Sequence, residues 1–225
     1  MPIVTHDTAP RPTARPPIAD PVSRVRRMVG SAREHGGDRI VGDGLGELEL
    51  ALARVDAPAD IRVRGGLGSG RRTLAAALRT RRGWRPAIDD LDVLAAHDGA
   101  ARTPPDVEIT RTPPDVEIIC LRTAPCRHEE AWVRRPRAHP LLVVATGVDE
   151  AAPPRWARGL PAVDARRASD GSLDVVVSFL DRALEGLPAV RLARLEAELE
   201  RLSVHDRVGD LAEAALCALG PQGRT

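Results

Sequence analysis

The feature that most constrains this chain is a glycine-rich stretch between a short β-branched segment and an Ala/Leu-rich one. Residues 59–64 read ADIRVR, the alternating pattern of a strand, and GGLGSGRR follows directly. The next residues, TLAAALRT, have the composition of a helix. Strand, glycine loop and helix in this order predict the opening unit of an α/β domain.

Further strands alternate with helices along the chain. VEIICL at 116–121 and LLVVA at 141–145 are apolar runs of strand length, and residues 127–135 between them form a polar helical stretch. A short strand at 160–163 and an amphipathic helix from Ser172 follow. We therefore expect an α/β fold with three layers, similar to P-loop NTPases, in which helices flank a mainly parallel sheet.

The two ends of the chain differ from this central part. Residues 1–21 are rich in Pro, Thr and Ala without periodicity, which predicts a disordered leader. Residues 22–58 carry two helices with apolar positions at helical spacing, and residues 188–225 predict a helical hairpin. We expect these helices to flank an α/β domain over 59–187 and to form a helical bundle, packed on their own domain or on a partner.

The glycine loop has the backbone of a phosphate-binding loop without its side chains. In the pattern GxxxxGK[ST], loop amides surround phosphate oxygens, the lysine bridges the outer phosphates and the hydroxyl holds magnesium. Gly65 and Gly70 occupy the two glycine positions, but Arg71 and Arg72 follow them, with Thr73 one place later. A guanidinium cannot replace the lysine ammonium without moving the phosphates or the loop, and a second cation repels magnesium.

What remains of the loop allows only weak binding. Thr73 would lie about 100° further around the helix than a metal-binding hydroxyl. The N-terminus of the helix by itself binds phosphate or sulfate weakly. All 33 basic residues are arginine, so no lysine from elsewhere in the chain can take the missing place.

Two segments carry a resemblance to a known family. GGLGSGRRTLAAAL resembles the first motif of dynamin-like and related P-loop GTPases, G-x-x-G-x-G-K-S-T-L-x-x-A-L. LLVVATGVDE is similar to the strand that ends in their guanine-reading motif NKxD, with Thr146, Gly147 and Asp149 at its three fixed positions. The resemblance covers roughly residues 59–185 and implies that, of these three, only the guanine-reading aspartate, Asp149, is retained.

The same resemblance implies that the catalytic groups are missing. No DxxG motif ends a strand, and the closest string, LRTAP, puts Arg122 where a metal-linked aspartate belongs. Phosphoryl transfer depends on positioning and on charge stabilisation by lysine and magnesium. We therefore expect a catalytically inert pseudo-GTPase with no required cofactor and no metal site. Its vestigial site for GTP, GDP or phosphate would comprise Gly65, Gly70, Arg71, Arg72, Thr73 and Asp149.

Three readings of the function stay open. The resemblance implies a protein-interaction module that binds an active dynamin-like GTPase through the terminal helices. Alternatively, the chain is a working nucleotide-dependent enzyme with an atypical loop, because residues 68–94 also resemble small-molecule kinases of the adenylate-kinase type, with Asp89, Asp90 or Asp92 as the acidic residue. In the third reading the chain is an adaptor for a chaperone, a protease or another regulator.

Charge and hydropathy exclude other classes of function. Lys+Arg 33 against Asp+Glu 32 gives a net charge of +1, which provides no strong field for nucleic acid or an anionic membrane. No apolar run approaches the roughly 20 residues that cross a bilayer, and no signal-peptide core is present. We expect a cytoplasmic protein with reduced cysteines, no transmembrane segment and no nucleic-acid partner.

The sequence also contains an exact tandem repeat. RTPPDVEI occurs at 102–109 and again at 111–118. Only one copy can be the central strand, and paired prolines favour turns, so we interpret the first copy as an edge strand or a loop without chemistry.

Overall fold

The computed structural model describes residues 20–35, 43–91, 113–149 and 151–220. The chain divides into two compact units, a sheet unit over Ala57–Arg191 and a helical unit that combines Met1–Asp56 with Leu192–Thr225. Most of the expected leader, the first copy of the repeat and Asp92 lie outside the described residues.

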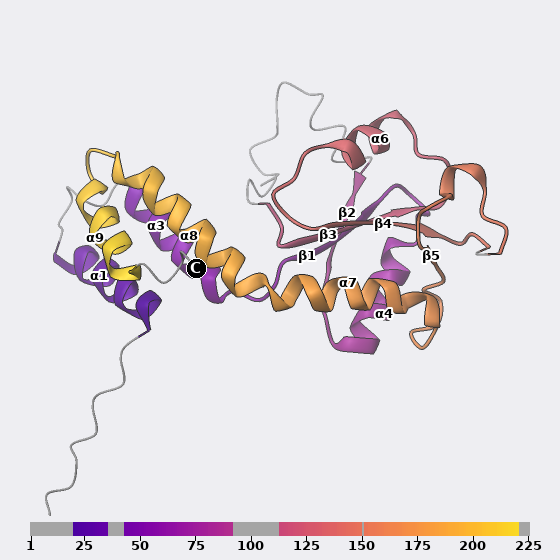
Figure 1. The fold of residues 1–225 in the computed structure, drawn as a ribbon, viewed down its shortest axis with the longest axis horizontal. Coiled ribbons are helices and arrows are strands. Elements are labelled where there is room, and N and C mark those ends of the chain that lie inside the picture. The colour runs from indigo at the N-terminus through magenta and orange to yellow at the C-terminus, as the bar shows by residue number, and fades with distance from the viewer. Residues whose placement is uncertain (1–19, 36–42, 92–112, 150, 221–225) are drawn as a thin grey trace, which may run out of the picture. The chain divides into compact units, whose positions relative to one another are not determined.

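The sheet unit is built on five parallel strands in the order β2-β1-β3-β4-β5. They are β1 (Ile61–Gly65), β2 (Ala87–Asp90), β3 (Val116–Leu121), β4 (Leu141–Thr146) and β5 (Ala162–Val163). Val63 of β1 lies opposite Ile88 on one side and Ile118 on the other. The α/β class and the parallel sheet flanked by helices are thus confirmed (Figure 1).

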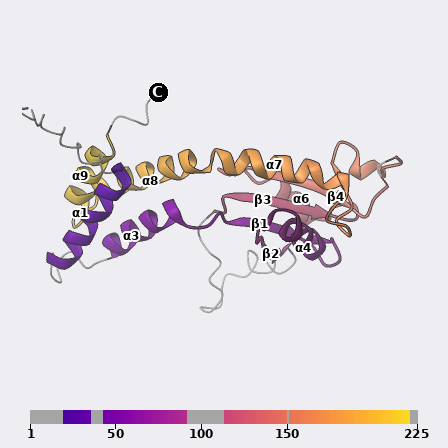
Figure 2. The ribbon, with the colours of Figure 1, turned by 90° about the horizontal axis from the view of Figure 1, so that it is seen from below.

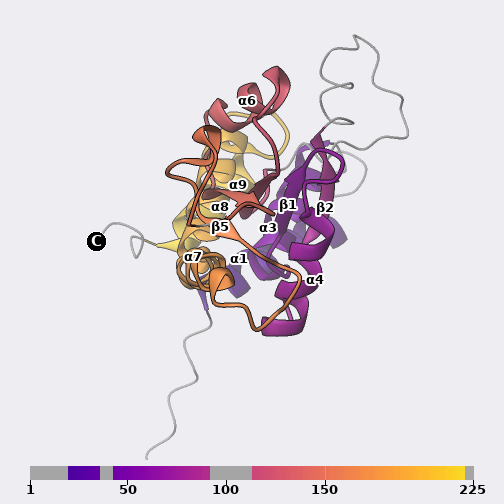
Figure 3. The ribbon, with the colours of Figure 1, turned by 90° about the vertical axis from the view of Figure 1, so that its right-hand side faces the viewer.

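Helices cover both faces of this sheet. α4 (Arg71–Arg82) and α7 (Asp174–Glu185) lie on one face, and α6 (Arg127–Arg134) lies on the other (Figure 3). Two short 3-10 helices, η1 (Arg155–Ala157) and η2 (Gly171–Leu173), belong to the connections. This arrangement leaves the carboxyl ends of the strands as the edge at which the βα connections meet.

Alternation along β3 separates the two faces. Val116, Ile118 and Cys120 belong to the main hydrophobic cluster with α4 and α7, whereas Ile119 and Leu121 belong to a smaller cluster under α6. Successive side chains of a strand point to opposite faces of the sheet, so a strand that is buried throughout needs packed elements on both faces. The third residue of β3 on the α6 face is Glu117, and that face is therefore partly polar.

The helical unit contains α1 (Pro21–His35), α3 (Asp43–Asp56) and α9 (Gly209–Leu219), together with the part of α8 (Leu187–Ser203) from Leu192 onward. α1 lies beside α3 and α9 (Figure 2). Buried residues from all four helices form one cluster, which includes Val25, Leu48, Leu199 and Ala215. None of the helices within the described ranges combines the length and apolar character of a bilayer-crossing segment.

Candidate functional site

The glycine loop that follows β1 owes its conformation to two glycines. A Cβ on Gly65 would lie 2.2 Å from Ser69 Oγ and 2.6 Å from the carbonyl oxygen of Cys120, so only glycine fits there. Gly70 has φ +80° and precedes α4, whose N-terminus has no side-chain cap. The loop therefore places the N-terminus of α4, the positive end of the helix dipole, at the carboxyl edge of the sheet.

A cavity of about 410 Å³ lies at this edge. It is bounded by the segments that follow four strands, β1, β3, β4 and β5, and its lining residues are Gly68, Gly70, Thr73, Arg122, Thr146, Gly147, Val148, Asp149, Val163, Asp164, Ala165 and Arg166. Ligands of open α/β sheets bind outside the carboxyl ends of the strands, and the volume is that of a small-molecule site.

The cavity brings together half of the residues expected at the site. Gly70, Thr73 and Asp149 all line it, although Thr73 was expected to lie further around the helix. Asp149 Oδ1 accepts a hydrogen bond from the amide of Ala151, at 2.9 Å. The other three expected residues, Gly65, Arg71 and Arg72, are not among the lining residues.

Arg71, at the lysine position, is held inside the protein. Its side chain is buried, donates a hydrogen bond to the carbonyl of Gly66 and forms an ion pair with Asp90. Asp90 lies on β2, opposite Gly65 of β1, so the order of the strands places a carboxylate beside the start of α4. The guanidinium at the lysine position is thus neutralised by a carboxylate of β2. The neighbouring Arg72 is exposed.

Thr146 fastens the end of β4 to the glycine loop. Its buried hydroxyl donates to the carbonyl of Ser69 at 2.5 Å, with the carbonyl of Leu121 at 3.3 Å. A Cβ on Gly70 would lie 3.3 Å from the same hydroxyl. The two loops on either side of β3 are therefore held at a fixed separation.

The charged residues of the cavity differ in their pairing. Arg166 binds Asp164 through Nε and Oδ1, at 2.8 Å, and the hydrogen bonds from Arg166 lower the pKa of Asp164 to about 2. Arg122 donates only to the carbonyl of Gly68, at 3.4 Å, and no carboxylate of the described residues forms an ion pair with it. Arg122 thus lines the cavity without a carboxylate partner among the residues that the structure describes.

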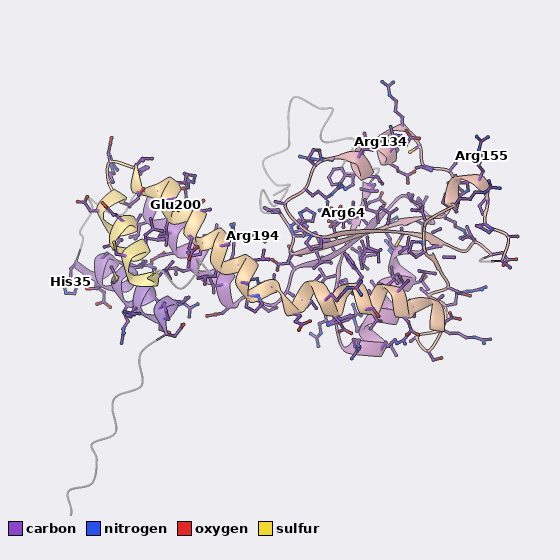
Figure 4. All side chains as sticks on the ribbon, viewed as in Figure 1. His35, Arg64, Arg134, Arg155, Arg194 and Glu200 are labelled. Carbon is purple, nitrogen blue, oxygen red and sulfur yellow. The ribbon has the colours of Figure 1, made fainter. Side chains whose placement is uncertain are left out.

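A second charged cluster lies on the α6 face of the sheet, where Figure 4 shows Arg64. Glu117 is fully buried on β3 and accepts hydrogen bonds from Arg64, at 3.0 Å, and from Trp132 and Arg137, both at 2.7 Å; His139 Nε2 lies 2.9 Å from its carboxylate. Burial raises the pKa of Glu117, but the hydrogen bonds and nearby charges outweigh burial and lower the pKa to about 2.

The same cluster includes one of the acidic residues expected in a kinase. Asp89 on β2 accepts from Arg64 Nε at 2.9 Å and lies 3.5 Å from Arg62. With Asp90 bound to Arg71, both described aspartates of this stretch are engaged in ion pairs within the sheet unit.

The structure shows no metal centre in the residues it describes. Within these ranges, no three His, Cys, Asp or Glu side chains are grouped to hold an ion. Cys126 Sγ lies 3.2 Å from His128 Nδ1, but desolvation and the neighbouring Glu129 carboxylate raise the pKa of its thiol. Burial raises the pKa of the Cys120 thiol to about 12. Neither thiol is therefore an activated nucleophile.

The Arg71–Asp90 pair was not predicted from the sequence, because it depends on the order of the strands, which the sequence does not state. The resemblance had aligned Arg122 with a metal-linked aspartate, but Arg122 was not among the expected site residues. Its position in the cavity had a signal, because Arg122 directly follows an apolar strand and such residues gather at the carboxyl edge. Together the fold and the cavity define an α/β unit with a small-molecule-sized cavity at the carboxyl edge of a parallel sheet.

Comparisons of the chain with known protein families, with curated proteins and with solved structures found no match.

Proposed function

We propose that this chain is a non-catalytic, GTPase-like module that acts through binding and not through phosphoryl transfer. The observation that carries the proposal is the position of Arg71. Its guanidinium is bound by Asp90 and by the carbonyl of Gly66, and it does not line the cavity. A phosphate in the cavity would meet no cation from the position that a lysine occupies in an active loop.

The neighbouring positions also disfavour a bound magnesium ion. Arg72 is an exposed cation at the place of the metal-binding hydroxyl, and Arg122 lines the cavity where the resemblance implies a metal-linked aspartate. Thr73 lines the cavity, but a single neutral hydroxyl beside two cations would be a poor magnesium ligand set. The proposed module therefore needs no metal cofactor.

The kinase alternative gains no support from the positions of its candidate residues. Asp89 and Asp90 each form an ion pair with an arginine of the sheet unit, and neither lines the cavity. A carboxylate that meets substrate or metal in a kinase has to face the ligand.

The proposal is tested by restoring the lost side chains. We expect Arg71→Lys/Arg72→Ser to bind GTP about tenfold more tightly in magnesium than in EDTA, because the variant regains a phosphate-binding ammonium and a metal-binding hydroxyl. Isothermal titration measures the ratio of the two affinities. The control is Arg79→Lys/Thr80→Ser, which also places a lysine and a serine side by side, but near the other end of α4, and for which we expect a ratio near one.

Two results contradict the proposal. The first is a wild-type protein whose affinity for GTP or ATP already rises with magnesium. The second is a restored variant that folds like the wild type and gains no magnesium dependence, because the loop would then not be similar to a P-loop.

A further inference from the structure

The connection between β5 and η2 carries a sequence pattern that the cavity does not explain. Residues 166–170 read RRASD, and Ser169 is the only serine or threonine of the chain with arginine both two and three places before it. Basophilic protein kinases recognise this pattern, because carboxylates in their substrate groove pair with the two guanidinium groups. Ser169 is therefore a candidate phosphoryl acceptor, provided that the fold exposes it.

The fold places this pattern on the surface. Arg166, Arg167 and Ser169 are all exposed. The amide of Asp170 donates to the carbonyl of Arg167 at 3.0 Å, which closes a four-residue turn with Ser169 at its third position. Among the hydrogen bonds of the described residues, none engages the Ser169 hydroxyl. A kinase needs an accessible hydroxyl on a segment that can enter its groove, and a surface turn meets this requirement.

The two nearest serines, Ser172 and Ser178, differ from Ser169. Ser172 is half-buried, and its hydroxyl accepts a hydrogen bond from the amide of Asp164 at 2.8 Å. Ser178 is exposed but lies inside α7, and apolar residues precede it. Of these three serines, only Ser169 combines the arginine pattern, a surface turn and a hydroxyl that the fold does not use.

Arginines around the turn can compensate the charge of an added phosphate. The two arginines of the pattern belong to the turn, and Arg81 of α4 donates to the carbonyl of Asp170 at 3.1 Å. Phosphoserine carries about −1.5 to −2 charges at neutral pH and three acceptor oxygens, which guanidinium groups bind well. Arg166 also pairs with Asp164 in the lining of the cavity, so a phosphate on Ser169 would compete with that carboxylate.

We propose that Ser169 is a phosphorylation site for a basophilic serine kinase, a separate protein that recognises Arg166 and Arg167. The kinase transfers the terminal phosphoryl group of ATP. The bond between that phosphorus and the bridging oxygen breaks, a bond from phosphorus to Ser169 Oγ forms, and ADP leaves with the bridging oxygen. The hydroxyl proton passes to a carboxylate of the kinase. The site goes beyond the proposed function and does not depend on a ligand in the cavity.

The test is phosphorylation of the full, folded chain with magnesium ATP and a purified basophilic kinase, the catalytic subunit of cyclic-AMP-dependent protein kinase. We expect one phosphate per chain, located at Ser169 by tandem mass spectrometry. Ser169→Ala should lose this incorporation. The matched control is Ser178→Ala, the same exchange at an exposed serine of α7, which should be phosphorylated like the wild type.

A second variant removes the recognised charges and keeps the hydroxyl. We expect Arg166→Ala/Arg167→Ala to lower kcat/KM for phosphorylation about a hundredfold, because two charged hydrogen bonds to the kinase are lost. The matched control is Arg134→Ala/Arg135→Ala, an exposed arginine pair at the end of α6, for which kcat/KM should stay within about twofold of the wild type. Circular dichroism confirms that each variant is folded, as expected for exchanges of exposed side chains.

Three results overturn the proposal. They are a folded chain that takes up no phosphate, incorporation that persists in Ser169→Ala, and an Arg166→Ala/Arg167→Ala variant that is phosphorylated as fast as the wild type. A synthetic peptide of residues 162–173 is the positive control for the kinase; if it is phosphorylated and the chain is not, the fold hides the pattern and the proposal is wrong. These results leave the proposed function standing, because nucleotide binding and turnover test that separately.

Discussion

At the scale of single residues, the sheet unit neutralises several arginines internally. Arg71 is paired with Asp90, Arg64 with Glu117, and Arg191 with Asp115, at 2.6 Å in the last pair. A buried charge is tolerated when a partner and further hydrogen bonds compensate its loss of hydration. Arg122 differs from these arginines, because its side chain is exposed and no carboxylate of the described residues pairs with it.

Glu117 is the buried carboxylate that pairs with both Arg64 and Arg137. We expect Glu117→Gln to lower the free energy of unfolding by about 3–5 kcal/mol, since Arg64 and Arg137 lose their counter-charge. Guanidinium chloride unfolding measures the change. Glu130→Gln, on the exposed side of α6, is the control, and we expect a change below about 0.5 kcal/mol. A Glu117→Gln variant as stable as the wild type would contradict this account.

The same carboxylate sets the response to acid. The pKa of Glu117 in the folded chain, about 2, lies below its ordinary value of 4.5, so the ionised form stabilises the folded state above about pH 4.5. That stabilisation is lost as the pH falls from 4.5 toward 2. Unfolding measured over this range should therefore show a steeper loss of stability in the wild type than in Glu117→Gln, and equal slopes would argue against the assignment.

At the scale of the elements, the sequence predicted the strands whose apolar residues follow one another along the chain. The runs VEIICL and LLVVA gave β3 and β4 with nearly their observed bounds, and the glycine loop located the end of β1. β2 was missed because AIDD is short, half-exposed and acidic, and only its hydrogen bonds to β1 make it a strand. The pairing of Arg71 with Asp90 follows from that strand order and could not be predicted without it.

The close packing of the glycine loop gives an element-scale prediction. Gly65→Ala should lower the free energy of unfolding by about 1–3 kcal/mol, because the new methyl group would overlap the Cys120 carbonyl, which belongs to the backbone of β3 and cannot rotate away. Thermal and denaturant unfolding measure the loss. Gly186→Ala is the matched control at the end of α7, where no atom lies within 4 Å of the added carbon. Equal stability of the two variants would show that the loop is loosely packed.

At the scale of the whole molecule, the sheet unit contains the cavity and the helical unit buries its own cluster of apolar residues. Among the described residues, the exposed large apolar side chains come from different parts of the fold; they are Leu50, Leu67, Ile88, Val175, Val190 and Val204. Association with an active dynamin-like GTPase, which the resemblance implies, stays a prediction. A pull-down with and without residues 190–219 tests whether the terminal helices carry it.

The measurement that most directly tests the account is phosphate release from GTP and ATP by the wild-type chain in excess magnesium. We predict a rate equal to that of the nucleotide alone, because the cation at the lysine position is bound by Asp90 and the metal position holds Arg72. A rate that rises in proportion to protein concentration and is lost in Arg71→Ala would contradict the central claim.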